Sequence, residues 1–130
     1  MSTKVIQDVL QLQTQGIMEG SLGWQISEDE AKRLVLPIQI TYFNQIEPAG
    51  YVISLTIDEA HGHPLFRDAV TEIKKVSSAE TLAITCIVAQ VYVRTAARSF
   101  GRYRNLYRQA EDSLRNAGFS RFHGIIKQSN

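Results

Sequence analysis

The sequence contains few of the residues that cross-link or interrupt small folds. Its 130 residues include one cysteine, Cys86, and only three prolines. One thiol excludes an internal disulfide and a cysteine-based zinc site. The chain also lacks any apolar run near the roughly 20 residues that cross a bilayer. Its polar start, with Asp8 and several glutamines, lacks the apolar stretch of a secretory signal. We therefore expect a cytoplasmic protein with no metal site and no membrane partner.

The composition of the chain is that of a globular protein. Hydrophobic residues make up 44% of the sequence and charged residues 21%, a balance that supports a packed core and argues against disorder. The length fits a single domain over residues 1–130. No repeat or linker composition divides the chain.

The basic residues are concentrated in the last third of the chain. Residues 94–130 hold eight lysines and arginines against Glu111 and Asp112, a local balance of about +6 in a chain of net charge +1. Such an asymmetry indicates an anionic partner, either a phosphorylated cofactor or nucleic acid. A solvated helix rich in arginine is the plainer alternative.

The first half of the sequence predicts helices around a hairpin. Ser27 and Glu30 have the spacing of a capping box, which opens a short helix. Two runs of β-branched and aromatic residues flank a turn at Pro48 and predict an antiparallel hairpin. The predicted elements are helices over 3–16, from Ser27 to about Leu34 and over 64–75, and strands over 38–44 and 50–58.

The second half contains one ambiguous stretch. The apolar residues of ETLAITCIVAQVYV fit either a helix or a buried strand. Their β-branched types favour a central strand over 84–93, and one continuous helix over 79–97 is the alternative. An apolar stripe that ends at Gly118 predicts a helix over 101–117, and a last strand is expected over 119–127. The predicted fold class is α+β, with a mixed, mostly antiparallel sheet flanked by helices.

The stretch VYVRTAARSFGRYRNLYRQAEDSLRNAGFSRFHGIIKQSN has the order strand, basic glycine loop, helix, strand. This is the layout of a phosphate-binding βαβ unit. Over about forty residues it resembles motif A of the GNAT acetyltransferase superfamily. Gly118 stands twenty residues after Arg98, where the family's helix typically ends, and Asn130 stands where the family often has an asparagine. The matching strand and loop positions are Val91, Val93, Arg98, Gly101 and Tyr103.

The resemblance implies that the chain binds acetyl-CoA or another acyl-CoA as co-substrate. The backbone of Val91 and Val93 would hold the pantetheine arm in the manner of a strand. Arg98 and Arg102 would add charge beside the phosphates, since phosphate recognition favours arginine. The backbone N–H groups expected to face the pyrophosphate are those of Phe100, Gly101, Arg102 and Tyr103.

Three features depart from the family pattern, and one is that no first strand precedes the N-terminal helix. Tyr103 stands where the family has glycine or alanine, and a side chain there crowds a pyrophosphate. The sequence stops at Asn130, where the family continues with a helix and two strands, so the resemblance implies a GNAT-like fold truncated at the C-terminus. A sheet that ends there has an exposed edge, which predicts a homodimer that covers it.

Acyl transfer to an amine requires a base. The expected central strand carries no carboxylate, so the catalytic candidate is Glu59, beside Asp58 at the end of the hairpin. His61 and His63 lie in a Gly/Pro turn that we interpret as a loop, with a base or half a metal site as the alternative. Cys86 stands in an apolar run and is expected to be a buried hydrophobic residue rather than a nucleophile.

Three functions from different classes fit these observations. The leading one is an acyl-CoA-binding protein, an N-acyltransferase for an unidentified amine if catalysis is retained. The first alternative is a non-catalytic interaction protein, dimerising or regulatory, with a GNAT-like core. The second is a nucleic-acid binder that uses the basic last third. It is disfavoured because Glu111 and Asp112 share that helix and no helix-turn-helix or RNP-type motif is present.

Overall fold

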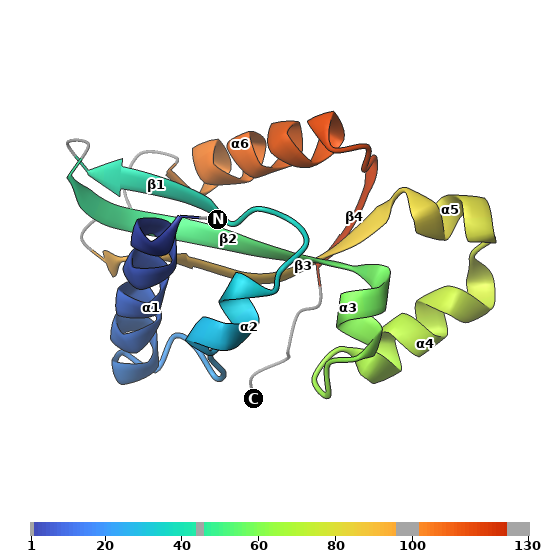
Figure 1. Ribbon diagram of the computed structural model, residues 1–130, viewed down its shortest axis with the longest axis horizontal. Coiled ribbons are helices and arrows are strands. Elements are labelled where there is room, and N and C mark those ends of the chain that lie inside the picture. The colour runs from blue at the N-terminus through green and yellow to red at the C-terminus, as the bar shows by residue number, and fades with distance from the viewer. Residues whose placement is uncertain (1, 44–45, 96–101, 125–130) are drawn as a thin grey trace.

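The computed structural model describes residues 2–43, 46–95 and 102–124 and shows an α+β fold (Figure 1). None of the helices in these residues combines the length and the apolar character needed to span a membrane. In chain order the elements are α1 (Thr3–Met18), α2 (Glu28–Lys32), β1 (Gln39–Phe43), β2 (Glu47–Thr56), α3 (Ile57–His61), α4 (Arg67–Val76), α5 (Ala79–Ala83), β3 (Thr85–Val93), α6 (Arg102–Asn116) and β4 (Arg121–Gly124).

The described strands form one mixed sheet in the order β1–β2–β3–β4. β2 is antiparallel to both of its neighbours, whereas β4 lies parallel to β3. A parallel pair requires a crossover connection, and α6 lies within it. β3, α6 and β4 therefore form the βαβ unit that the sequence predicts. Figure 1 shows α6 along one face of the sheet and α1 on the other.

Each face of the sheet has its own core. On the α1 face, α1 to α4 pack against Tyr51 and Ile53 of β2. On the α6 face, Leu106 of α6 packs against Val52 and Val93. Because side chains alternate along a strand, neighbouring residues of β2 supply the two cores. The sheet is therefore the middle layer of three.

The two long helices end in similar ways. Gly20 follows α1 with a φ of +79°, and Gly118 follows α6 with a φ of +100°. Only glycine adopts such angles readily, because it has no Cβ. At its other end α1 is capped by Ser2, whose Oγ accepts a hydrogen bond from the N–H of Val5 at 3.3 Å. The end of α6 just before Gly118 confirms the helix stop that the sequence predicts there.

The structure confirms the main elements expected from the sequence. The predicted hairpin is the antiparallel pair β1 and β2. Residues 85–93 are a strand, so the alternative of one helix over 79–97 is wrong. The helices expected over 3–16 and 101–117 correspond to α1 and α6. The α+β class, with a mixed sheet between helices, is confirmed as well.

The strand expected over 50–58 is wrong at both ends. β2 begins at Glu47 and stops at Thr56, where α3 begins. The cause is a second capping box. Thr56 Oγ1 accepts from the N–H of Glu59 at 3.1 Å, and Glu59 Oε1 accepts from the N–H of Thr56 at 3.0 Å. This reciprocal pair satisfies donors that a helix start leaves open.

Other boundaries also differ from the sequence prediction. The helix expected over 64–75 begins at Arg67, because Pro64 lies in the turn before it. The short helix expected to reach Leu34 ends at Lys32. α5 was not predicted, although Ser78 caps it by accepting from the N–H of Thr81. The last strand, expected over 119–127, begins at Arg121 and is described to Gly124. Its expected end at 127 lies outside the described residues.

Candidate functional site

β3 contains one residue more than β2 opposite it. The register shifts by one at Ala89, which has no partner on β2. Such a β-bulge changes the face to which the following side chains point. Beyond it, Gln90 and Tyr92 face α1, whereas Val91 and Val93 pack toward α6. Bulges often lie beside active sites because they redirect a side chain or end a pairing.

β3 also extends past the described part of β4. β4 pairs with residues 85–88 of β3, and among the described residues no strand pairs with this edge at residues 89–91. The backbone N–H of Arg94 donates to β2 at 2.9 Å. Because backbone groups alternate in direction along an antiparallel strand, those of Val91 and Val93 are directed to the edge away from β2.

A buried polar network holds the loop after α1 against β3. Gln90 Oε1 accepts hydrogen bonds from Gln13 Nε2 at 2.9 Å and from the Tyr51 hydroxyl at 2.6 Å. Gln90 Nε2 donates to the carbonyl of Trp24 at 2.9 Å, and Gln13 Oε1 accepts from the N–H of Ile26 at 3.3 Å. Burial raises the pKa of Tyr51 well above its usual value, so its hydroxyl remains a donor. These buried polar side chains are thus fully paired, which fixes the loop.

A cavity of about 460 Å³ lies beside the bulge. We call it the bulge pocket. Its floor is formed by residues 89–91, and its walls come from the loop after α1 and from the segment before α4. Trp24 and Phe66 meet edge to face there, with ring centroids 5.6 Å apart. The apolar lining residues are Leu22, Trp24, Leu65, Phe66 and Ala89, together with Val91.

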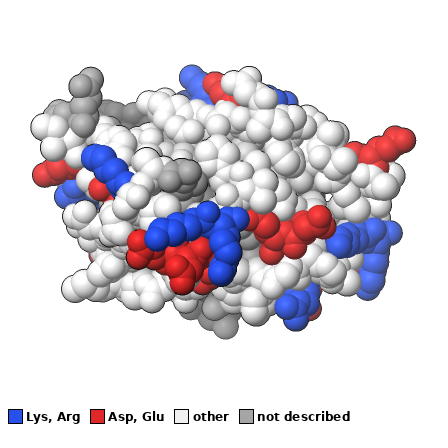
Figure 2. Space-filling view, in the orientation of Figure 1, with Lys and Arg blue, Asp and Glu red and all other residues white. Residues whose placement is uncertain are grey.

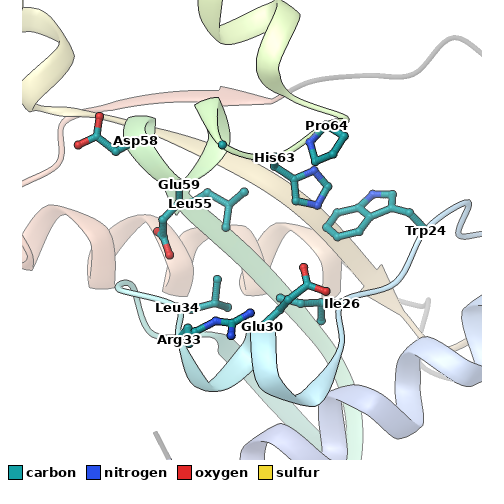
Figure 3. Close-up of a pocket in the computed structure, with 11 residues that line it drawn as sticks. Trp24, Ile26, Glu30, Arg33, Leu34, Leu55, Asp58, Glu59, His63 and Pro64 are labelled. Carbon is teal, nitrogen blue, oxygen red and sulfur yellow. The ribbon is translucent and has the colours of Figure 1, made fainter.

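A second cavity, of about 400 Å³, lies between α2 and α3 (Figure 3). We call it the α2–α3 pocket. Figure 3 shows Glu30 on α2 and Arg33 just after it at one side, with Asp58 and Glu59 on α3 across from them. Trp24 lines this cavity and the bulge pocket alike. One aromatic ring therefore lies between a charged cavity and an apolar one.

The two histidines have different partners. His63 lines the α2–α3 pocket and packs on Trp24, with ring centroids 5.3 Å apart. Its Nδ1 accepts from the N–H of Leu65 at 3.1 Å, so the neutral ring carries its proton on Nε2. His61 Nδ1 instead lies 3.2 Å from Lys74 Nζ. Within the described residues, no three His, Cys, Asp or Glu side chains gather as metal ligands.

Glu59, the predicted base, has both carboxylate oxygens engaged. Oε1 takes part in the α3 capping box, and Oε2 accepts from the N–H of Val35 at 3.1 Å. The carboxylate thus ties α3 to the segment before β1. It also lines the α2–α3 pocket beside Asp58. Its role as a base stays a prediction.

The predicted phosphate loop is only partly within the described residues. Arg102 and Tyr103 form the first turn of α6. Leu106, one turn on, packs in the same cluster as Val93 at the end of β3. The start of α6 therefore lies at the carboxyl end of β3, as a βαβ unit requires. The predicted residues outside the described part of the chain are Arg98, Phe100 and Gly101.

Sequence reasoning missed the glutamine network, and a signal for it was present. Gln90 interrupts an otherwise apolar strand, and Gln13 stands on the buried stripe of α1. Buried polar side chains need partners, so two glutamines at core positions predict a bond between them. Cys86, expected to be a buried hydrophobic residue, is 0% exposed, which confirms that prediction.

No family model matches the chain, and none of the curated proteins matches it. The candidate site is therefore defined by the chain's own geometry. It comprises the bulge in β3, the β3 edge beyond it and the two cavities that share Trp24.

Proposed function

We propose that this protein binds an acyl-CoA along the edge of β3 beyond β4. The observation that carries the proposal is the position of Val91. Its backbone N–H and C=O are directed away from β2, at residues where no described strand pairs with this edge. The edge lies next to the bulge and leads toward the start of α6. An extended ligand placed there lies between a strand and a helix N-terminus.

The chemistry of coenzyme A suits both the edge of β3 and the N-terminus of α6. Its pantetheine arm contains amide groups, and an exposed strand edge recognises extended amide-containing ligands through backbone hydrogen bonds. Its phosphates are anions, which the N-terminal N–H groups of a long helix favour. α6 has 15 residues. The sequence also places basic residues before and within its first turn, including Arg98 and Arg102.

We interpret the fold as a GNAT-like core, as the resemblance of the β3–α6–β4 region implies. The given sequence ends before the helix and two strands that follow in that family. We further propose a cytoplasmic protein, since a free buried thiol such as Cys86 suits a reducing compartment.

The α2–α3 pocket is the proposed site for an amine acceptor. Of the described residues, three carboxylates, those of Glu30, Asp58 and Glu59, line it against one cation, Arg33. Trp24 adds an aromatic ring, which attracts cations. We expect release of the CoA thiol from an acyl-CoA to require an added amine, and Asp58→Asn to raise the KM for that amine. Thiol release that is equal with and without amines would leave a binding protein without transferase activity.

Calorimetric titration with CoA tests donor binding. We expect wild type to bind CoA, Gly101→Val to lose most of the affinity through crowding at the phosphates, and Arg98→Ala to lose about 1.5–3 kcal/mol, less at high salt. Arg115→Ala is the control, because Arg115 pairs with Glu111 at 2.8 Å at the other end of α6. No affinity for any CoA ester up to millimolar concentration would overturn the proposal.

The same titration with duplex DNA distinguishes the nucleic-acid alternative from the proposed binding of acyl-CoA. On the side of the molecule seen in Figure 2, basic and acidic side chains are intermixed. Pairs such as Lys32 with Glu28, 3.4 Å apart, and Lys75 with Glu72, 2.9 Å apart, are those of a solvated surface. Tighter binding of DNA than of CoA would favour the alternative.

Self-association is a separate expectation. A homodimer that covers a sheet edge or a hydrophobic helix face predicts twice the mass of one chain in sedimentation at tens of micromolar. A strict monomer would contradict both the dimer and the interaction-protein alternative in its dimeric form.

A further inference from the structure

The bulge pocket is larger than an acetyl group requires. At about 460 Å³ it falls within the roughly 300–1,000 Å³ of cavities that enclose drug-sized ligands. Its walls are chiefly the rings and aliphatic side chains of Leu22, Trp24, Leu65 and Phe66, with Ser21 beside them. Among the described residues, no Asp, Glu, Lys or Arg side chain lines it, in contrast to the α2–α3 pocket.

The polar side chain on its floor is already engaged. The amide of Gln90 accepts from Gln13 and Tyr51 and donates to the carbonyl of Trp24. A polar ligand group in the cavity would therefore compete with an existing network, and a buried polar group without a partner is costly. An apolar ligand gains from the same walls, because burial of methylene groups is favourable.

The floor of the pocket is also part of the edge proposed for the donor. Ala89 of the bulge and Val91 of the edge both line the cavity. A thioester held against this edge has its acyl group at the cavity. We infer that the bulge pocket binds the acyl chain of the donor, and that this chain is of medium length, longer than acetyl. The inference rests on the proposed function and names its substrate class.

Calorimetry with CoA, acetyl-CoA and octanoyl-CoA tests the inference. Each fully buried methylene changes Kd about fourfold. With partial burial of the six extra methylenes, we expect octanoyl-CoA to bind 10- to 100-fold more tightly than acetyl-CoA. Trp24 is the only tryptophan, so its emission reports filling of the cavity. It should shift with octanoyl-CoA and not with CoA.

The variant Leu65→Asp tests whether the acyl chain of the donor binds in the bulge pocket. Leu65 is 53% exposed, so the change places a carboxylate at the cavity wall while sparing the core. We expect it to remove most of the octanoyl preference and to leave CoA affinity unchanged. Val76→Asp is the matched control, because Val76 is 86% exposed on α4 and does not line the cavity. It should keep the full preference.

Octanoyl-N-acetylcysteamine, a thioester without the nucleotide, separates the inference from the proposed function. Binding of CoA with equal affinities for all three CoA species overturns the inference alone. A Trp24 shift with octanoyl-N-acetylcysteamine but no CoA affinity supports an acyl-chain pocket and overturns the proposed donor. Absence of both responses overturns the two together.

Discussion

The two faces of the sheet are stabilised in different ways. The α6 face is an apolar contact in which Leu106 and Leu114 pack against the strands, with one smaller cavity of about 280 Å³ between α6 and the sheet. The α1 face has a larger core that also contains the Gln13–Gln90 hydrogen bond and two cavities. Apolar burial is non-directional, whereas a satisfied polar network specifies one arrangement. The comparison suggests that packing on the α6 face mainly stabilises the fold. On the α1 face, part of the core instead positions the residues of the candidate site.

Each face contains its own probe. Cys86, the only cysteine, is buried on the α6 face with Leu114. Trp24, the only tryptophan, lies on the α1 face at the wall of both cavities. Thiol labelling therefore reports opening of one face, and tryptophan emission reports rearrangement of the other.

The largest effect is expected on the α6 face. Leu106 is 0% exposed, so Leu106→Ala should lower the free energy of unfolding by about 3–5 kcal/mol through lost burial and a cavity. Urea denaturation measures the loss, and labelling of Cys86 should become faster. Arg108→Ala, exposed on the same helix, should stay within about 0.5 kcal/mol of wild type. A loss below 1 kcal/mol for Leu106→Ala would contradict a packed α6 face.

The next largest loss of stability is expected on the α1 face. Gln90→Leu leaves the donors of Gln13 and Tyr51 and the carbonyl of Trp24 without this partner. We expect a loss of about 2–4 kcal/mol, because each buried unpaired group costs about 1–3 kcal/mol. Trp24 emission should move to longer wavelength as the loop loosens, while Cys86 labelling in the native state should change little.

A combined variant shows whether the cost comes from unpaired groups. Gln13→Leu, Tyr51→Phe and Gln90→Leu together remove most of the donors and acceptors at once, so their joint cost should be below the sum of the three single costs. Additive costs would mean that the three side chains do not act as one network.

The difference between the faces also determined what the sequence could predict. The α6 face follows from periodicity, because its stripe and the stop at Gly118 are local signals. The bulge at Ala89 is not local. It depends on which residues of β2 stand opposite, and the sequence alone does not fix that register. The spacing of Thr56 and Glu59 in the sequence is that of a capping box, but the β-branched residues around it favoured a longer strand. The cavities arise from loop placement, which depends on tertiary contacts.

A third prediction uses the thiol on the α6 face. Burial raises the pKa of Cys86 from its usual 9.0 to about 11. Between these values the unfolded chain releases the thiol proton while the folded chain keeps it, so stability falls as pH rises from 9 to 11. Below pH 9 the thiol adds no pH dependence. The loss should reach about 2 kcal/mol at most, at about 1.4 kcal/mol per pH unit.

Cys86→Ala is the control for that titration. Its free energy of unfolding should fall less than that of wild type between pH 9 and 11, measured by urea denaturation at each pH. Identical slopes for the two proteins would show that the thiol titrates in the folded state as it does in the unfolded chain.

The smallest effect should be equal on the two sides of the sheet. Gly20 ends α1 and Gly118 ends α6, both at positive φ, and a Cβ built on either meets no atom within 4 Å. The cost of Gly→Ala is therefore only that of the left-handed backbone, about 1–2 kcal/mol, and asparagine should recover part of it. Gly23→Ala is the control, because its added Cβ also meets nothing and its φ is not positive, so it should be neutral or slightly stabilising. Thermal denaturation of the three variants measures the difference. A much larger loss for Gly118→Ala than for Gly20→Ala would mean that the turn into β4 also holds the parallel strand in place, and that the α6 face depends on more than apolar packing.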